Sequence, residues 1–146
     1  MPCQTIKTEN KDNMYVQQFK DFLFLLGSES KELFDFFSVD ELHGLKKSDC
    51  LKIKDYQYSS FIAGHCNFIP NKKNIYTKDS PYYIFINAKR LGNRYQDITL
   101  LNHECMHLSL FLHDYDVMKK EEIIVSYAEN CTHLLVRTLI NLGYVY

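Results

Sequence analysis

The sequence predicts an α+β fold, from three patterns that follow one another along the chain. In the first third, apolar residues recur at spacings of three and four, as in a helix. In the middle third, aromatic and β-branched residues partly alternate, as in strands. In the last third, two helical segments flank a short polar loop. We therefore expect N-terminal helices, a small and mostly antiparallel sheet, and two C-terminal helices.

The first third predicts two helices. Gly27 offers a C-cap to the first helix, and Ser30 offers an N-cap to a second, short one that carries Leu33, Phe36 and Phe37. The helical spacing of the first segment rests on five apolar residues: Val16, Phe19, Phe22, Leu23 and Leu26.

The middle third predicts strands separated by a turn. Residues 51–69 are rich in aromatic and β-branched side chains, and residues 70–74, Pro-Asn-Lys-Lys-Asn, form a turn signal. Residues 82–87, Tyr-Tyr-Ile-Phe-Ile-Asn, are typical of a buried strand.

The last third predicts two helices joined by a short loop. The first begins at Asp97 as a plausible N-cap and runs to about His113. The second runs from about Lys120 to Leu142. A polar loop at residues 114–120, Asp-Tyr-Asp-Val-Met-Lys-Lys, joins them.

Composition excludes several classes of protein. The 146 residues predict a single domain, and the formal net charge of −1 gives no electrostatic footprint for nucleic acid. No apolar run is long enough to span a membrane, and the polar first residues do not have the pattern of a secretory signal. The five cysteines are odd in number and lack CxxC spacing, so we expect free thiols and a cytoplasmic protein.

The motif that carries chemistry is His-Glu-Cys-Met-His at residues 103–107. On a helix, residues four apart lie on one face, so His103 and His107 can present two imidazoles to one zinc ion. Glu104 sits where its carboxylate reaches a zinc-bound water rather than the metal. Zinc lowers the pKa of that water, and Glu104 can take its proton and pass it to a leaving amine. The competing interpretation is a fortuitous pair of surface histidines, which the helical setting makes less favoured.

The stretch "IFINAKRLGNRYQDITLLNHECMHLSL" resembles the core of small zincin metallopeptidases. It is most similar to the phage- and mobile-element-associated group typified by the ImmA/IrrE metallopeptidases. The resemblance covers about residues 82–135, with Met106 where that group usually carries glycine. It implies a strand ending in Asn, the HExxH helix, and a later helix that supplies a glutamate ligand to zinc.

A catalytic zinc needs a third protein ligand, and one candidate is His113. The frame from His103 to His113 is that of the metzincins, but Leu110 stands where those enzymes carry the glycine that lets the chain leave the helix. In an unbroken helix, His113 lies about 240° around from His107 and points away from the metal.

The other candidates are glutamates on the last helix, which would make a His₂Glu site. We rank Glu121 first, because Ala128 lies two turns along the same face and leaves room for the helices to approach. Glu122 ranks second and Glu129 third, since both lie on the polar face. Glu129 would nevertheless be level with the histidines in a tight antiparallel hairpin.

The sequence therefore predicts a zinc metallopeptidase with one zinc ion per chain. His103, His107 and Glu121 are the predicted metal ligands, and Glu104 is the predicted general base. Its substrate would be a peptide or protein that adds as a strand to residues 82–87 or to the neighbouring stretch 61–68. The alternative is a binding or regulatory module that keeps the zincin fold, with or without zinc, and does not turn over substrate.

Overall fold

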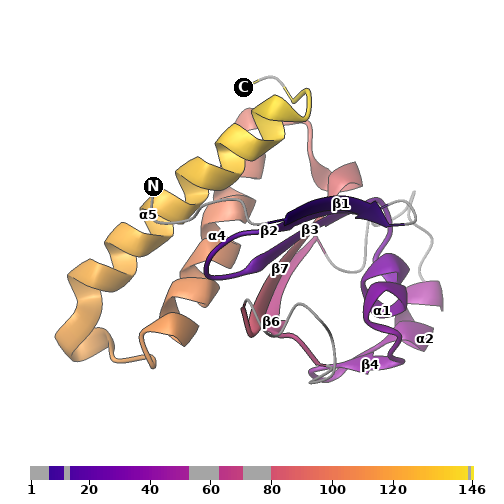
Figure 1. Cartoon of the computed structure of the whole chain (residues 1–146), viewed down its shortest axis with the longest axis horizontal. Coiled ribbons are helices and arrows are strands. Elements are labelled where there is room, and N and C mark those ends of the chain that lie inside the picture. Colours follow the sequence, from indigo (N-terminus) through magenta and orange to yellow (C-terminus); the bar gives the residue numbers. More distant parts are fainter. Residues whose placement is uncertain (1–6, 12–13, 53–62, 71–79, 145) are drawn as a thin grey trace. The chain divides into compact units, whose positions relative to one another are not determined.

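The computed structural model describes residues 7–11, 14–52, 63–70, 80–144 and 146. The chain divides into two compact units, Met1–Leu91 and Gly92–Tyr146. The first unit contains all the described strands and the second contains a pair of long helices (Figure 1). The predicted α+β class is confirmed.

The first unit is built on a five-stranded sheet of order β1-β2-β3-β7-β6. Its neighbouring strands are antiparallel except for β3 and β7, which run parallel. The strands are β1 (Lys7–Lys11), β2 (Met14–Gln18), β3 (Leu23–Gly27), β6 (Gly64–Phe68) and β7 (Tyr82–Asn87). The prediction of a small, mostly antiparallel sheet is confirmed.

The helix predicted between residues 16 and 26 is wrong, because these residues form β2, a tight turn and β3. Phe19 N–H donates to the Phe22 carbonyl at 2.9 Å and closes the turn. Residues 22–26 are an uninterrupted apolar run, and β3 lies between β2 and β7 with all five of its residues buried. An interior strand covered on both faces has this composition, and it mimics helical spacing when read alone.

Gly27 is the last residue of β3 rather than a helix cap. A Cβ atom there would lie 2.8 Å from the Glu32 carboxylate and 3.0 Å from the Phe85 ring. Glycine is therefore needed at this position for close packing against the sheet and the helix that follows.

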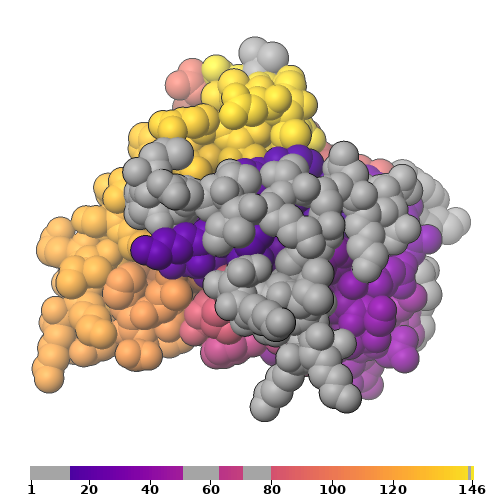
Figure 2. Space-filling view, in the orientation of Figure 1, coloured from indigo at the N-terminus to yellow at the C-terminus, as the bar shows by residue number. Residues whose placement is uncertain are grey.

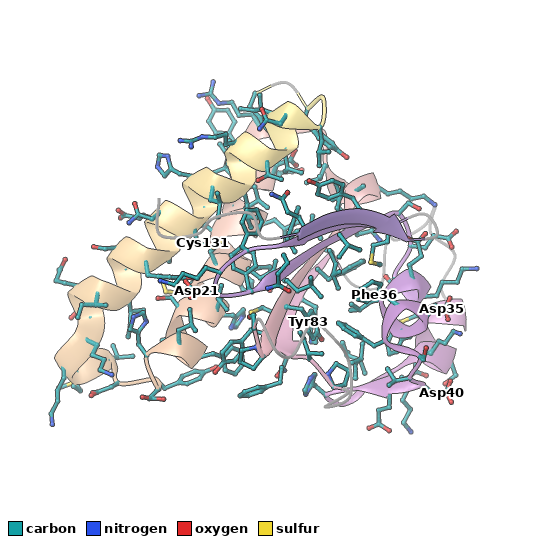
Figure 3. The ribbon with its side chains drawn as sticks, viewed as in Figure 1. Asp21, Asp35, Phe36, Asp40, Tyr83 and Cys131 are labelled. Atoms are coloured by element: carbon teal, nitrogen blue, oxygen red, sulfur yellow. The ribbon has the colours of Figure 1, made fainter. Side chains whose placement is uncertain are left out.

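The short helix predicted after Ser30 is confirmed as α1 (Lys31–Phe37), although the Ser30 side chain makes no capping hydrogen bond. Phe37 packs against Tyr83 of β7, with ring centroids 5.1 Å apart. Tyr83 is labelled in Figure 3. The unit is completed by α2 (Lys47–Lys52), the 3₁₀ turn η2 (Ala88–Arg90) and a small hairpin of β4 (Glu41–Leu42) and β5 (Leu45–Lys46).

The strand predicted at residues 82–87 is confirmed as β7, but it is not an edge. It pairs with β3 on one side and β6 on the other. Its ladder groups are therefore occupied, and peptide addition at residues 82–87 is excluded in this sheet. Among the described strands, β6 is an edge strand, so the prediction of peptide addition is kept for β6 alone.

The second unit is a hairpin of α4 (Arg94–Leu112) and α5 (Val117–Asn141), which lie side by side in Figure 1. Both predicted helices are confirmed. The N-cap of α4 is Asn93, four residues before the predicted Asp97. Asp97 instead lies buried in the first turn.

Two remaining expectations concern parts of the chain outside the description. The strand pattern at residues 53–62 and the turn signal at residues 71–74 lie outside the described residues. Among the residues that are described, none of the helices combines the length and apolarity needed to cross a bilayer.

Candidate metal site

The helix that carries the motif is fixed at its N-terminus by two side chains. The Asn93 side chain accepts hydrogen bonds from the backbone N–H groups of Tyr95 and Gln96, at 3.1 and 3.2 Å. One oxygen of Asp97 accepts from Gly92 N–H at 2.9 Å and from the Tyr146 hydroxyl at 2.7 Å. These contacts satisfy donors that a helix N-terminus leaves unpaired, and they set the start of α4.

One face of α4 is packed against α5 through small side chains. Ser109 Oγ donates to the Ile124 carbonyl at 2.7 Å, and the sulfurs of Cys105 and Cys131 are 3.0 Å apart. Cys105, Ser109, Cys131 and Ala128 are all buried. Small residues permit a close approach of two helices, and these contacts fix the register between them.

The histidine pair lies on the other side of α4. Cys105 is two residues from both His103 and His107, so each imidazole leaves the helix about 160° around from the Cys105 side chain. Both imidazoles are accessible to solvent. Cys105 itself is fully buried, on the side of α4 opposite the two histidines.

The two imidazoles converge on one point. The Nε2 atoms of His103 and His107 are 3.1 Å apart, with the rings at 81° to each other. Two imidazole nitrogens bound tetrahedrally to one zinc ion, each at 2.0–2.1 Å, would be about 3.3 Å apart. The pair therefore fits a single zinc ion with almost no movement.

The lowered pKa of His107 also favours metal binding. Burial, followed by the charge of the neighbouring His103, lowers the pKa of His107 below its ordinary value. Neutral imidazole is the form that binds metal, so this shift increases the binding-competent fraction at neutral pH.

Glu104 completes the group. A ligand atom from each of His103, Glu104 and His107 lies within 4.8 Å of the others. The side chain is only 4% exposed, and burial raises its pKa to about 7. A carboxyl group with that pKa exchanges protons readily at neutral pH, which is the property of a general base and acid.

The structure does not bring Glu121 to the histidines. The pairing of Cys105 with Cys131 and of Ser109 with Ile124 places His107 level with about residue 128 of α5. Glu121 is seven residues further along, about 10 Å down the helix axis at 1.5 Å per residue. Its side chain is exposed, next to a kink at Lys120. Glu121 as third ligand remains a prediction that this geometry does not support.

The lower-ranked glutamates, Glu122 and Glu129, also lie away from the histidines, for a different reason. Glu129 is level with the histidines, as expected for a tight hairpin, and both it and Glu122 are exposed. However, α5 packs on the Cys105 face of α4, and the histidines leave the opposite face. Among the described residues, neither glutamate joins the converging group.

His113 is the C-cap residue of α4. The helix continues through Leu110 to Leu112, as expected from the missing glycine. Nδ1 of His113 lies 2.7 Å from the Ser109 carbonyl, and its ring contacts Tyr127 at 5.8 Å. The side chain therefore serves the helix terminus and the hairpin, and it is directed away from His103 and His107.

Within the described ranges, the three motif residues are the one set of three metal-ligating side chains that converge. Sequence reasoning missed the partner of Cys105. Cys131 is 26 residues away, and only the register of the hairpin brings the two sulfurs together.

Comparisons of the chain with protein-family models, with curated proteins and with solved structures found no match. The chemistry of the site therefore carries the function proposed below.

Proposed function

We propose that this protein is a zinc-dependent metallopeptidase whose active site is centred on His103, Glu104 and His107. The observation that carries the proposal is the convergence of the two imidazole Nε2 atoms to 3.1 Å beside a buried carboxylate. Hydrolysis by an activated water requires side chains that hold a metal ion and a group that accepts a proton. The two imidazoles can supply the first, and a carboxyl group with a pKa of about 7 can supply the second.

His103 and His107 would hold the metal through Nε2, on the solvent-accessible side of α4. The third protein ligand of a catalytic zinc would have to come from outside the group that converges among the described residues. When bound, zinc supplies a water of lowered pKa and polarises the scissile carbonyl. Glu104 then takes a proton from the attacking water and passes it to the nitrogen of the leaving amine. The raised pKa of Glu104 suits both steps, because the group must accept the proton and then release it.

Burial of Glu104 supports this role on energetic grounds. Removing much of the water around a carboxylate destabilises its charged form. Burial is the cause of the raised pKa of Glu104, and no charged or hydrogen-bonding partner among the described residues contributes to that shift. A bound cation beside it would stabilise the charged form, and so would a water that donates to its oxygens.

The competing function is a regulatory or binding module that uses the same fold without turnover. It retains the same histidines, so metal binding does not separate the two functions. Only peptide hydrolysis that depends on Glu104 distinguishes the peptidase from the binding module.

The test is a peptidase assay on an unfolded protein substrate, with purified protein whose zinc content is measured. We expect about one zinc ion per chain and cleavage that a chelator abolishes and added zinc restores. The variant Glu104→Gln should keep its zinc and lose activity by on the order of 100-fold or more. Glu122→Gln is the matched control, because it makes the same change on exposed α5 surface.

Zinc-loaded protein that cleaves nothing would leave the binding module as the function. Full activity in Glu104→Gln would exclude the mechanism. Protein that takes up no zinc would exclude the peptidase and leave a zinc-free binding module.

A further inference from the structure

We propose that Cys105 and Cys131 form a reversible disulfide under oxidising conditions, which covalently fastens α4 to α5. The proposal concerns the packed face of α4 and does not depend on the metal chemistry proposed for the opposite face. It revises the expectation that all the cysteines serve only as free thiols.

The geometry places the two sulfurs within reach of a bond. Cys105 Sγ lies 3.0 Å from Cys131 Sγ. A disulfide requires about 2.05 Å, so the sulfurs must approach by about 1 Å. That distance is within the range of small side-chain rotations.

The surroundings hold the two thiols in position. Cys105 and Cys131 are 0% and 2% exposed. On α4, Ser109 lies one turn beyond Cys105 and is hydrogen-bonded to the Ile124 carbonyl. On α5, Thr132 follows Cys131 and its hydroxyl lies 3.2 Å from Asn102 Oδ1. Polar contacts on either side of the pair therefore fix the register that keeps the sulfurs together.

The other described cysteines are differently placed. Cys50 and Cys66 are buried in the first unit, on α2 and on β6. Neither forms a disulfide. Among the described cysteines, Cys105 and Cys131 are the pair whose sulfurs lie at the contact distance given above.

Because both thiols are buried, a peroxide reaches them when the two helices transiently separate. One sulfur then attacks a peroxide oxygen, the S–O bond forms, the O–O bond breaks, and water leaves after a proton transfer. The second sulfur attacks the first, the S–S bond forms, the S–O bond breaks, and a second water leaves. The two thiols lose two electrons and two protons, and the peroxide is reduced to two waters. A dithiol reverses the reaction by thiol–disulfide exchange.

The disulfide would close a loop of the hairpin that contains the turn between α4 and α5. It would lie on the face of α4 opposite His103 and His107, so it would link α4 to α5 and leave the histidine face unoccupied. The expected consequence is a more stable hairpin, because the bond removes conformations from the unfolded chain.

The experiment treats the full-length, purified protein with hydrogen peroxide, then unfolds it and alkylates the remaining thiols. Peptide mapping should show one cross-link, between the peptides that contain Cys105 and Cys131. The thermal unfolding midpoint should rise by several degrees, and a dithiol should restore both the free thiols and the original midpoint.

Variants separate this pair from the other cysteines. Cys131→Ala should abolish both the cross-link and the rise in midpoint, whereas Cys66→Ala, a matched change at another buried thiol, should leave both unchanged. Should Cys131→Ala fail to fold, the peptide map of the unaltered protein still decides the question.

Three results would overturn the proposal. The first is a cross-link that joins another pair of cysteines. The second is oxidation of Cys105 to an acid without a cross-link. The third is complete alkylation of both thiols after peroxide treatment that does oxidise the urea-unfolded chain.

Discussion

The two faces of α4 differ in almost every physical property, although they alternate within five residues of sequence. The face that carries Cys105 and Ser109 is buried, made of small side chains and hydrogen-bonded to α5. The face that carries His103 and His107 is accessible to solvent and holds the side chains that could bind a metal ion. In Figure 2 the residues of α5 are coloured from orange to yellow.

The two faces of α4 therefore have different roles: one stabilises the hairpin, and the other carries the candidate metal ligands. Changes on the packed face should lower the free energy of unfolding without removing a metal ligand. Changes on the histidine face should remove metal binding at little cost in stability. Glu104 lies beside the histidines but is buried, so it should affect both.

The largest effect is expected at the histidines. His103→Ala and His107→Ala should each weaken zinc binding by on the order of 1000-fold, because each removes one of two converging ligands. Competition against a chromogenic chelator measures this. His113→Ala is the matched control and should change zinc affinity less than about threefold, since its ring is engaged with Ser109 and Tyr127. Equal losses in all three variants would contradict the assignment of faces.

Leucine truncations on the two faces provide a comparison in stability. Leu108→Ala should lower the free energy of unfolding by about 2–5 kcal/mol, because the side chain is fully buried and truncation leaves a cavity. Leu110→Ala, on the side of the histidines and only half-buried, should cost less than about 1 kcal/mol. Urea denaturation measures both. A larger loss at Leu110 would reverse the assignment of faces.

The buried Glu104 makes the stability of the zinc-free protein depend on pH. Burial raises its pKa from 4.5 to about 7, so between these pH values the folded state binds more protons than the unfolded state. Stability contributed by the protonated carboxyl is therefore present below pH 4.5 and is lost as pH rises through about 7. The loss should amount to about 3 kcal/mol in total.

The measurement is urea denaturation in chelator at several pH values, for the natural protein and for Glu104→Gln. The difference between the two should grow from pH 5 to pH 8 in favour of the glutamine variant. A constant difference would show that Glu104 is ionised at its ordinary pKa, and the buried position would then be wrong.

A smaller effect is expected at the hydrogen bond between the two helices. Ser109→Ala removes the 2.7 Å donation to the Ile124 carbonyl and should cost about 1 kcal/mol. Ser126→Ala makes the same change at an exposed position of α5 and should be nearly neutral. Equal stabilities of the two variants would show that this hydrogen bond does not stabilise the hairpin.

The smallest effect is expected at the glutamates of α5. In the register described, Glu121→Ala and Glu129→Ala should each change zinc affinity by less than about threefold, since α5 lies behind the histidine face. A loss at Glu121 as large as at His103 would confirm the sequence-based ligand. It would also require α5 to move along α4 when metal binds.

Much of the second unit could be predicted from the sequence, because local signals agree there. The spacing of the histidines, the apolar positions of α4 and the short polar loop all favour the same helical hairpin. The helix boundary was missed because Asn93 and Asp97 are both good caps. Asp97 instead accepts a hydrogen bond from Tyr146, which is 49 residues away.

The first unit shows where local reasoning fails. Residues 23–27 form the strand β3 because β2 and β7 flank them, and β7 comes from a stretch about 60 residues later. Periodicity alone does not separate a short apolar run in a buried strand from one in a helix. The ranking of Glu121 failed to find support for a related reason. Its position on α5 suited a ligand, but the register between two helices depends on contacts such as Cys105 with Cys131.

The most direct test of the central claim is X-ray absorption spectroscopy at the zinc edge of the metal-loaded protein. We expect two imidazole nitrogens at about 2.0–2.1 Å from the zinc ion, with oxygen in the remaining positions and no sulfur. It also predicts that the imidazole signal falls in His107→Ala. Sulfur at about 2.3 Å would contradict the account, because Cys105 would then face the metal and the two faces of α4 would be exchanged.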